Sequence, residues 1–178
     1  VRTRFAPSPT GYMHIGNLRT ALFEYLIAKK DGGDFILRIE DTDQGRKVEG
    51  AVDIIYDTLK TCGLNWDEGP DVGGNYGPYI QSERKEIYHA FIKRLIELGR
   101  AYPCFCNAET LNNIRENQEK KLERTGYYGR YATCRNISID ESIERVKNGE
   151  PYILRFRSSG SHLNKTSFID GARGKIEL

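Results

Sequence analysis

Residues 4–17 read RFAPSPTGYMHIGN and predict how the fold begins. Residues 1–6 predict a short strand, which ends at the loop 7–11 because proline is excluded from central strands and helix interiors. A helix is expected after residues 14–17, with Asn17 as its N-cap and with apolar residues at helical spacing: Leu18, Ala21, Leu22, Tyr25 and Leu26. Free N–H groups and the positive end of a helix favour a polyphosphate at this point.

Further along the chain, strands and helices alternate. Residues 34–40 predict a buried strand, and a second amphipathic helix follows with the apolar face Val48, Val52, Ile55 and Leu59. Strand, helix, strand, helix at this spacing is typical of a parallel α/β sheet. Residues 63–78 predict a long loop, after which Ser82 is expected to cap a third helix and residues 101–106 to form a third strand.

The character of the sequence changes near residue 100, where we expect a domain boundary. Residues 107–124 predict a polar helix and residues 126–134 a tyrosine-rich turn. A capping box at Ser138 and Glu141 predicts a short helix, and residues 151–157 and 167–178 predict strands. The sequence therefore predicts two parts, residues 1–100 and 101–178.

The composition excludes several classes of protein. The 178 residues are 38% apolar and 29% charged, which is typical of a soluble globular protein and not of a disordered one. A net charge of +2 argues against a polycationic nucleic-acid coat but leaves a local basic groove open. With neither a run of 18 apolar residues nor a secretory core, we expect a cytoplasmic protein. Four cysteines in a reducing compartment favour metal binding over disulfides.

The loop and helix start at residues 7–17 carry groups that suit a nucleotide. Gly16 would let a flat ligand approach the backbone, and His14 and Asn17 can donate hydrogen bonds to phosphate oxygens. The pattern is neither a Walker loop nor G-x-G-x-x-G. The alternative is a proline-rich connection in which His14 only satisfies nearby backbone groups.

The sequence resembles the glutamyl-tRNA synthetases, which are class I aminoacyl-tRNA synthetases. The stretches that carry the resemblance are residues 4–11 (RFAPSPTG), 14–22 (HIGNLRTAL), 37–43 (LRIEDTD) and 81–84 (QSER). Residues 14–17 correspond to the class I signature HIGH with its last histidine replaced by asparagine. The resemblance implies the first half of a Rossmann-like catalytic domain, followed by an inserted α+β subdomain that binds the tRNA acceptor arm. It also implies ATP-dependent activation of L-glutamate and its transfer to tRNA(Glu).

The resemblance also implies roles for individual residues. Arg4 would pair with the side-chain carboxylate of the substrate, Ser8 would lie near its α-carboxylate, and Glu40 would bind its α-ammonium. His14 and Asn17 would be catalytic, Mg²⁺ would arrive with the ATP, and the nucleotide would be framed by Pro7, Pro9, Thr10, Gly11, His14, Gly16 and Asn17. The planar fork of arginine suits a carboxylate. The alternatives are an edge charge for Arg4 and a helix cap for residues 40–43.

Three cysteines form the second candidate site. Cys104, Cys106 and Cys134 could supply three corners of a tetrahedral zinc site, with Tyr131 as the fourth ligand or Tyr127 in its place. The resemblance supports such a site, and the alternative is three buried thiols without metal. Cys62, at the end of an apolar helical face, is expected in the core.

Residues 110–136 carry six Lys or Arg against three Glu, interleaved with tyrosines, which suits contact with an RNA acceptor arm. His89 and His162 are expected on the surface. The Lys-Met-Ser-Lys-Ser signature of class I cannot be present, because the one methionine is Met13. We therefore expect a monomeric N-terminal part of a synthetase that is inactive alone. The alternatives are a glutamyl-queuosine tRNA(Asp) synthetase and a non-catalytic, zinc-stabilised RNA-binding module.

Overall fold

The computed structural model describes residues 1–46, 48–158, 165–171 and 173–178. His162 lies outside these residues, so its surface position stays a prediction. The chain divides into two compact units, Val1–His89 and Ala90–Leu178, each of which is described by itself. Within the described ranges, no helix has the length and apolar character needed to cross a membrane.

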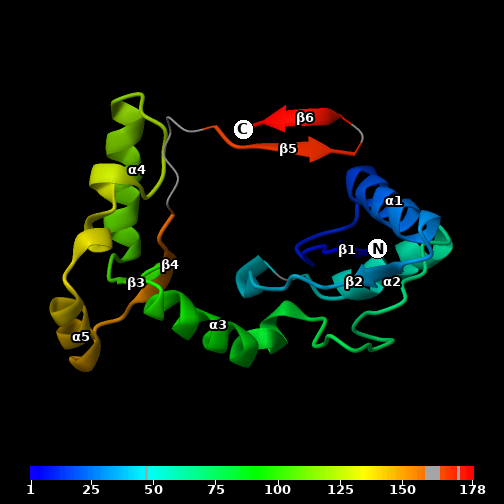
Figure 1. Cartoon of the computed structure of the whole chain (residues 1–178), viewed down its shortest axis with the longest axis horizontal. Coiled ribbons are helices and arrows are strands. Elements are labelled where there is room, and N and C mark those ends of the chain that lie inside the picture. Colours follow the sequence, from blue (N-terminus) through cyan, green and yellow to red (C-terminus); the bar gives the residue numbers. More distant parts are fainter. Residues whose placement is uncertain (47, 159–164, 172) are drawn as a thin grey trace. The chain divides into compact units, whose positions relative to one another are not determined.

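The first unit is built on two adjacent parallel strands that are connected in the sequence by a helix (Figure 1). Strand β1 (Arg2–Phe5) pairs with β2 (Asp34–Leu37) from Arg2↔Asp34 to Phe5↔Leu37, and helix α1 (Ile15–Lys30) connects them. Backbone hydrogen bonds from Arg38 to Phe5 and from Glu40 to Pro7 continue this pairing past both strands. The parallel α/β arrangement expected from the sequence is confirmed.

The segment expected as a long loop, together with Tyr79 and Ile80 directly after it, also pairs along the other edge of β2 and of the residues that follow β2. The Leu37 amide donates to the Glu68 carbonyl at 2.9 Å, and the Ile39 amide donates to the Tyr79 carbonyl at 2.9 Å. Both bridges, at Glu68 and at Ile80, are parallel. The sequence did not predict this pairing, because glycine, aspartate and proline dominate the segment and each contact is only one or two residues long.

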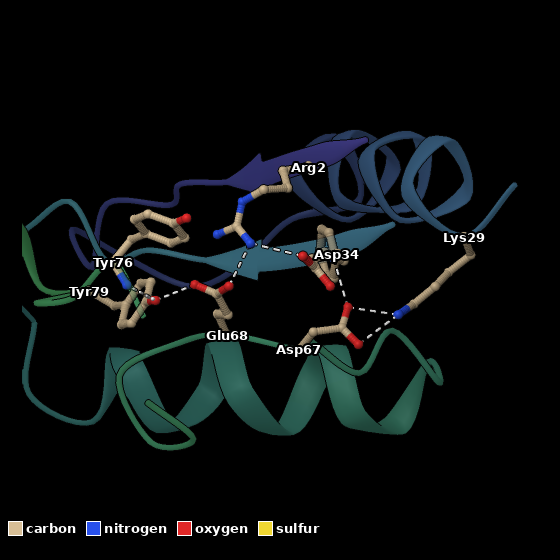
Figure 2. A network of polar contacts seen from close by, with 8 residues as sticks. Arg2, Lys29, Asp34, Asp67, Glu68, Tyr76 and Tyr79 are labelled. Atoms are coloured by element: carbon tan, nitrogen blue, oxygen red, sulfur yellow. Dashed lines mark hydrogen bonds and ion pairs between the residues drawn. The ribbon is translucent and has the colours of Figure 1, made fainter. Parts of the chain in front are cut away.

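Polar side chains attach this segment to the sheet (Figure 2). Arg2 donates to Asp34 at 2.8 Å and to Glu68 at 2.7 Å, and Tyr79 donates its hydroxyl to the other oxygen of Glu68. These hydrogen bonds hold the pKa of the Glu68 carboxyl below its ordinary value, the contact with Arg2 contributing most. Close by, Asp67 accepts from Lys29 at 2.7 Å.

Apolar side chains from the strands and helices form the core of the first unit. Helix α2 (Ala51–Thr61) begins after Val48, which is exposed. The buried residues of this helix are Ala51, Ile55 and Leu59. The other buried members of this core are Phe5, Ala21, Ala28, Phe35, Leu37, Ile39, Leu64 and Trp66. Leu22 and Leu26, two of the apolar residues that recur at helical spacing in α1, are 43% and 53% exposed in the structure.

Two short 3-10 helices and a longer helix complete this part. They are η1 (Gln44–Arg46), η2 (Gln81–Arg84) and α3 (Lys85–Glu97), and the boundary between the two units falls within α3. Ser82 does not cap a helix as expected. Instead its amide and hydroxyl both donate to Asp41, at 2.9 and 2.7 Å, because the parallel pairing of Ile39 and Ile80 brings these segments together.

The second unit pairs β3 (Ala101–Cys104) with β4 (Ile153–Phe156) in antiparallel fashion. Between them lie α4 (Ala108–Lys120), η3 (Gly129–Tyr131), η4 (Thr133–Asn136) and α5 (Ile139–Lys147), and Ser138 caps α5 as the capping box predicted. The single strand expected over residues 167–178 is a hairpin of β5 (Ser167–Asp170) and β6 (Gly174–Glu177), since a turn at Gly171 interrupts it.

Candidate active site

A hollow of about 570 Å³ opens beside the loop that joins β1 to α1. Seven of the residues predicted to bind substrate or nucleotide line it: Arg4, Pro7, Ser8, Thr10, Gly11, His14 and Asn17. Pro9, Gly16 and Glu40, which were also predicted, are not in the lining. Pro9 is fully buried and its carbonyl accepts from the Val48 amide at 3.0 Å, so it supports the loop from beneath.

His14, and not Asn17, is the N-cap of α1. Its Nδ1 accepts from the Gly16 amide at 3.1 Å, and its carbonyl accepts from the amides of Asn17 and Leu18. A ring nitrogen that accepts carries no proton, so the proton of the neutral imidazole is on Nε2. Capping therefore fixes the ring and leaves Nε2–H as a donor, while the Asn17 side chain lines the hollow.

The structure gives Gly16 a role that sequence reasoning missed. A Cβ at this position would lie 2.9 Å from Cε1 and 3.0 Å from Nδ1 of His14. Glycine here leaves room for the imidazole to fold back onto the first turn of the helix.

Arg4 and Glu40 lie side by side, as expected for residues at the carboxyl ends of neighbouring parallel strands. The Nη1 of Arg4 is 3.4 Å from Oε1 of Glu40. The same oxygen accepts from Nη2 of Arg38 at 2.6 Å. Arg38 was not predicted as a site residue, although strand alternation places residues 38 and 40 on one face and could have indicated it.

The other acidic residues of the 40–43 cluster have separate partners. Asp41 is buried and accepts from Ser82, while Asp43 pairs with Arg46 at 2.5 Å. Asp41 and Asp43 thus hold neighbouring structure through these contacts, whereas the alternative interpretation expected the cluster to cap a helix. Glu40 differs from them because its carboxylate is held by two arginines, one of which lines the hollow.

In the second unit, Cys104, Cys106 and Cys134 bring their sulfur atoms within 4.8 Å of one another. The Sγ atoms of Cys106 and Cys134 are 3.6 Å apart. A tetrahedral ion with Zn–S bonds of about 2.3 Å needs sulfurs separated by about 3.8 Å. The three thiols therefore fit three corners of a zinc site.

Two tyrosines were considered as the fourth ligand, and the structure favours Tyr127. Its hydroxyl lies 3.2 Å from Cys106 Sγ and accepts from the Cys134 amide at 3.1 Å. The Tyr131 hydroxyl instead donates to Glu123 at 2.7 Å. Cys62, expected in the core, is exposed, because it follows the last turn of α2.

Burial and hydrogen bonding act in opposite directions on the thiols. Burial by itself would raise the pKa of Cys104, but hydrogen bonds from Tyr127 and Arg155 lower that pKa to about 7. Burial raises the pKa of Cys106, and it also raises that of Tyr127 well above the ordinary value. Arg155 is a second residue that sequence reasoning missed, since its position beside Cys104 depends on strand pairing.

The parallel strand–loop–helix unit, with its capped helix start beside an Arg–Glu pair, has the form of a nucleotide-binding α/β domain of the class I synthetase type. The family description "tRNA synthetases class I (E and Q), catalytic domain" matches residues 1–178. The chain belongs to this family.

Relatives of known identity agree over the whole chain. A glutamate–tRNA ligase of Clostridium novyi is 57% identical over 178 residues, and one of Clostridium tetani is 55% identical. Among solved structures, a glutamate tRNA ligase from Elizabethkingia meningosepticum in complex with its amino acid is 39% identical with a TM-score of 0.87, and it too is matched over 100% of this chain. The chain spans 35% of the Clostridium novyi relative and 36% of the other two.

Proposed function

We propose that this chain forms the part of a glutamate–tRNA ligase that binds L-glutamate and the phosphates of ATP. The observation that carries the proposal is the joining of a capped helix start, with His14 and Asn17, to the Arg4–Glu40 pair on neighbouring strand ends. Family membership and relatives named glutamate–tRNA ligase support it. The alternative, a non-catalytic RNA-binding module, does not explain why these side chains are brought together.

The two charged side chains suit the two ends of an acidic amino acid. Arg4 offers a guanidinium to the side-chain carboxylate, and Glu40 offers a carboxylate to the α-ammonium. Ser8 is exposed in the lining near them and would bind beside the α-carboxylate. A ligand with both charges would replace the Arg4–Glu40 contact with two contacts of its own.

In the reaction proposed, an oxygen of the substrate α-carboxylate attacks the α-phosphorus of ATP, and pyrophosphate leaves as the new P–O bond forms. The 3′-terminal ribose of the tRNA then attacks the carbonyl carbon, and AMP leaves. The chain contributes positioning and charge stabilisation, with no covalent intermediate on the enzyme. The Nε2–H of His14 and the side-chain amide of Asn17 would donate to phosphate oxygens as negative charge develops there. Mg²⁺ would enter with the nucleotide.

We further infer that Cys104, Cys106, Cys134 and Tyr127 hold a structural Zn²⁺. Sulfur spacing and the contact of the Tyr127 hydroxyl with Cys106 support this set. A zinc content near one per chain, measured by elemental analysis after purification without chelator, is expected; a content near zero would remove the site.

We assign the acceptor arm of tRNA(Glu) to the second unit. Lys120, Lys121 and Arg124 are exposed at the end of α4, and within the described residues none of them pairs with a carboxylate. The rings of Tyr128 and Tyr131 lie 6.4 Å apart nearby, and rings of this kind can stack on an unpaired base. A cytoplasmic location and a monomeric state remain predictions, and the free thiols suit a reducing compartment.

The test uses a chimera in which this chain replaces the matching segment of the Clostridium novyi ligase. We expect glutamate-dependent ATP–pyrophosphate exchange and charging of tRNA(Glu) in preference to tRNA(Asp). Arg4→Met and Glu40→Gln should each abolish most of the exchange, while Arg94→Met, which removes an exposed ion pair with Glu97, should leave it unchanged. Charging of tRNA(Asp) alone would favour the alternative, a glutamyl-queuosine tRNA(Asp) synthetase. An active Arg4→Met, Glu40→Gln double variant would refute the proposed roles.

A further inference from the structure

Strand pairing places an arginine of β4 beside the cysteine cluster. Cys104 pairs with Ile153, and Tyr102 pairs with Arg155. Residues two apart along a strand share a face, so Cys104 and Arg155 lie diagonally across the same face of the pair. Diagonal neighbours are about 7–8 Å apart at the backbone, within reach of a long side chain.

The Arg155 guanidinium contacts the cluster through Tyr127. Its central carbon is 4.3 Å from the centroid of the Tyr127 ring, and the hydroxyl of that ring lies 3.2 Å from Cys106 Sγ. The backbone next to Tyr127 is also anchored from α4. The buried side chain of Gln118 donates to the Gly126 carbonyl at 2.8 Å and accepts from the Gly126 amide at 2.9 Å. Arg155 therefore lies against a tyrosine whose neighbouring backbone and hydroxyl are both held by hydrogen bonds.

The positive charge of Arg155 has no carboxylate partner among the residues that the structure describes, and its Nε is buried without a hydrogen bond. Arg145 differs from Arg155 in this respect. That arginine lies 4.1 Å from the centroid of the Phe105 ring, but it is neutralised by Glu150 at 2.5 Å. A partly buried guanidinium without a counter-charge is costly, so its charge needs another compensating group.

With Tyr127 bound as the neutral phenol, three thiolates around Zn²⁺ give the site a net charge of −1, which is the counter-charge that Arg155 lacks. We propose that Arg155 is a positioning residue of the zinc site: it balances the charge of the tris-thiolate ion and keeps Tyr127 turned toward the cysteines. This inference rests on the zinc site proposed above. Because the main contribution of Arg155 is its positive charge, a lysine at this position should retain most of the zinc affinity.

The experiment measures zinc affinity of the 178-residue chain by competition with a chelating dye, for the wild type, Arg155→Met, Arg155→Lys and Arg157→Met. Arg157 is the matched control, because it lies two residues further along and stacks on Tyr102, with its guanidinium carbon 5.0 Å from the ring centroid. Residues that support metal ligands typically change affinity by about 10- to 100-fold. We expect a loss in that range for Arg155→Met, and a loss of less than about threefold for Arg155→Lys and Arg157→Met.

The thermal midpoint of each metal-free protein in chelator separates the electrostatic role from a purely structural one. The electrostatic role leaves the midpoint of metal-free Arg155→Met equal to or above that of the wild type. Equal loss of affinity in the Met and Lys variants, together with a lower metal-free midpoint, would overturn the proposal. Wild-type affinity in Arg155→Met would overturn it too and leave the zinc site intact. A wild type that binds no zinc would refute the site and this inference together.

Discussion

Replacing Gly16 by alanine should impair catalysis while leaving stability almost unchanged. The added methyl group would lie 2.9 Å from Cε1 and 3.0 Å from Nδ1 of His14, which is too close for a normal contact, so the ring must shift from its capping position. Loss of an N-cap costs about 0.5–2 kcal/mol. Alanine in place of glycine inside a helix returns about 1 kcal/mol. The net change in unfolding free energy is therefore within about 1 kcal/mol of zero.

The effect on activity is much larger, because the Nε2–H of His14 loses its fixed direction. Removing one donor aimed at developing negative charge typically lowers the rate by about 10²- to 10³-fold. We expect a loss approaching this range for Gly16→Ala in glutamate-dependent ATP–pyrophosphate exchange by the chimera. Gly171→Ala is the control, since a Cβ there would meet nothing within 4 Å.

A double-mutant cycle tests whether the effect passes through the ring. Without the imidazole, the methyl group at position 16 has nothing to displace. His14→Ala combined with Gly16→Ala should therefore be no less active than His14→Ala alone, and more stable by up to about 1 kcal/mol. Losses of activity that multiply in the double variant would refute the reasoning.

Three further predictions concern Arg38, Glu68 and the core. Arg38→Met should raise KM for glutamate about tenfold, the equivalent of one lost contact of about 1.4 kcal/mol, without changing KM for ATP; equal changes in both would contradict a role in holding Glu40. Because the folded-state pKa of Glu68 lies below its unfolded value of 4.5, its stabilising contribution is complete above that pH and is lost as the pH falls through the folded pKa. Urea unfolding should therefore show a smaller loss of stability between pH 6 and pH 3 in Glu68→Gln than in the wild type, and equal losses would count against the network. Leu59→Ala, at a fully buried position, should lower the unfolding free energy by about 2–5 kcal/mol, against less than about 1 kcal/mol for Leu22→Ala; similar values for the two would contradict the core assignment.

Local signals in the sequence were enough to predict the frame of the first unit. Prolines end the opening strand, apolar spacing marks α1 and the β2 strand, and the carboxyl ends of two parallel strands must meet. The proximity of Arg4 and Glu40 could be predicted for that reason. Because Cys104 and Cys106 are two residues apart, only the approach of Cys134 depended on the folding of the second unit.

Other features depend on which distant segments meet, and only the tertiary structure decided them. Residues 68 and 80 pair with Ile36 of β2 and with Ile39 just after it, through single bridges that leave no periodic pattern in the sequence. His14 is the N-cap of α1 because its ring folds onto Gly16. The usual N-cap residues are Ser, Thr, Asn and Asp, and for that reason the sequence predicted Asn17 as the cap. Tyr127 and Tyr131 are the same residue type in the same turn, so the sequence does not distinguish them as ligands. In the structure the Tyr127 hydroxyl lies beside the thiols and the Tyr131 hydroxyl donates to Glu123. Side-chain direction within an irregular turn follows from long-range packing, so residue type and spacing alone do not determine it.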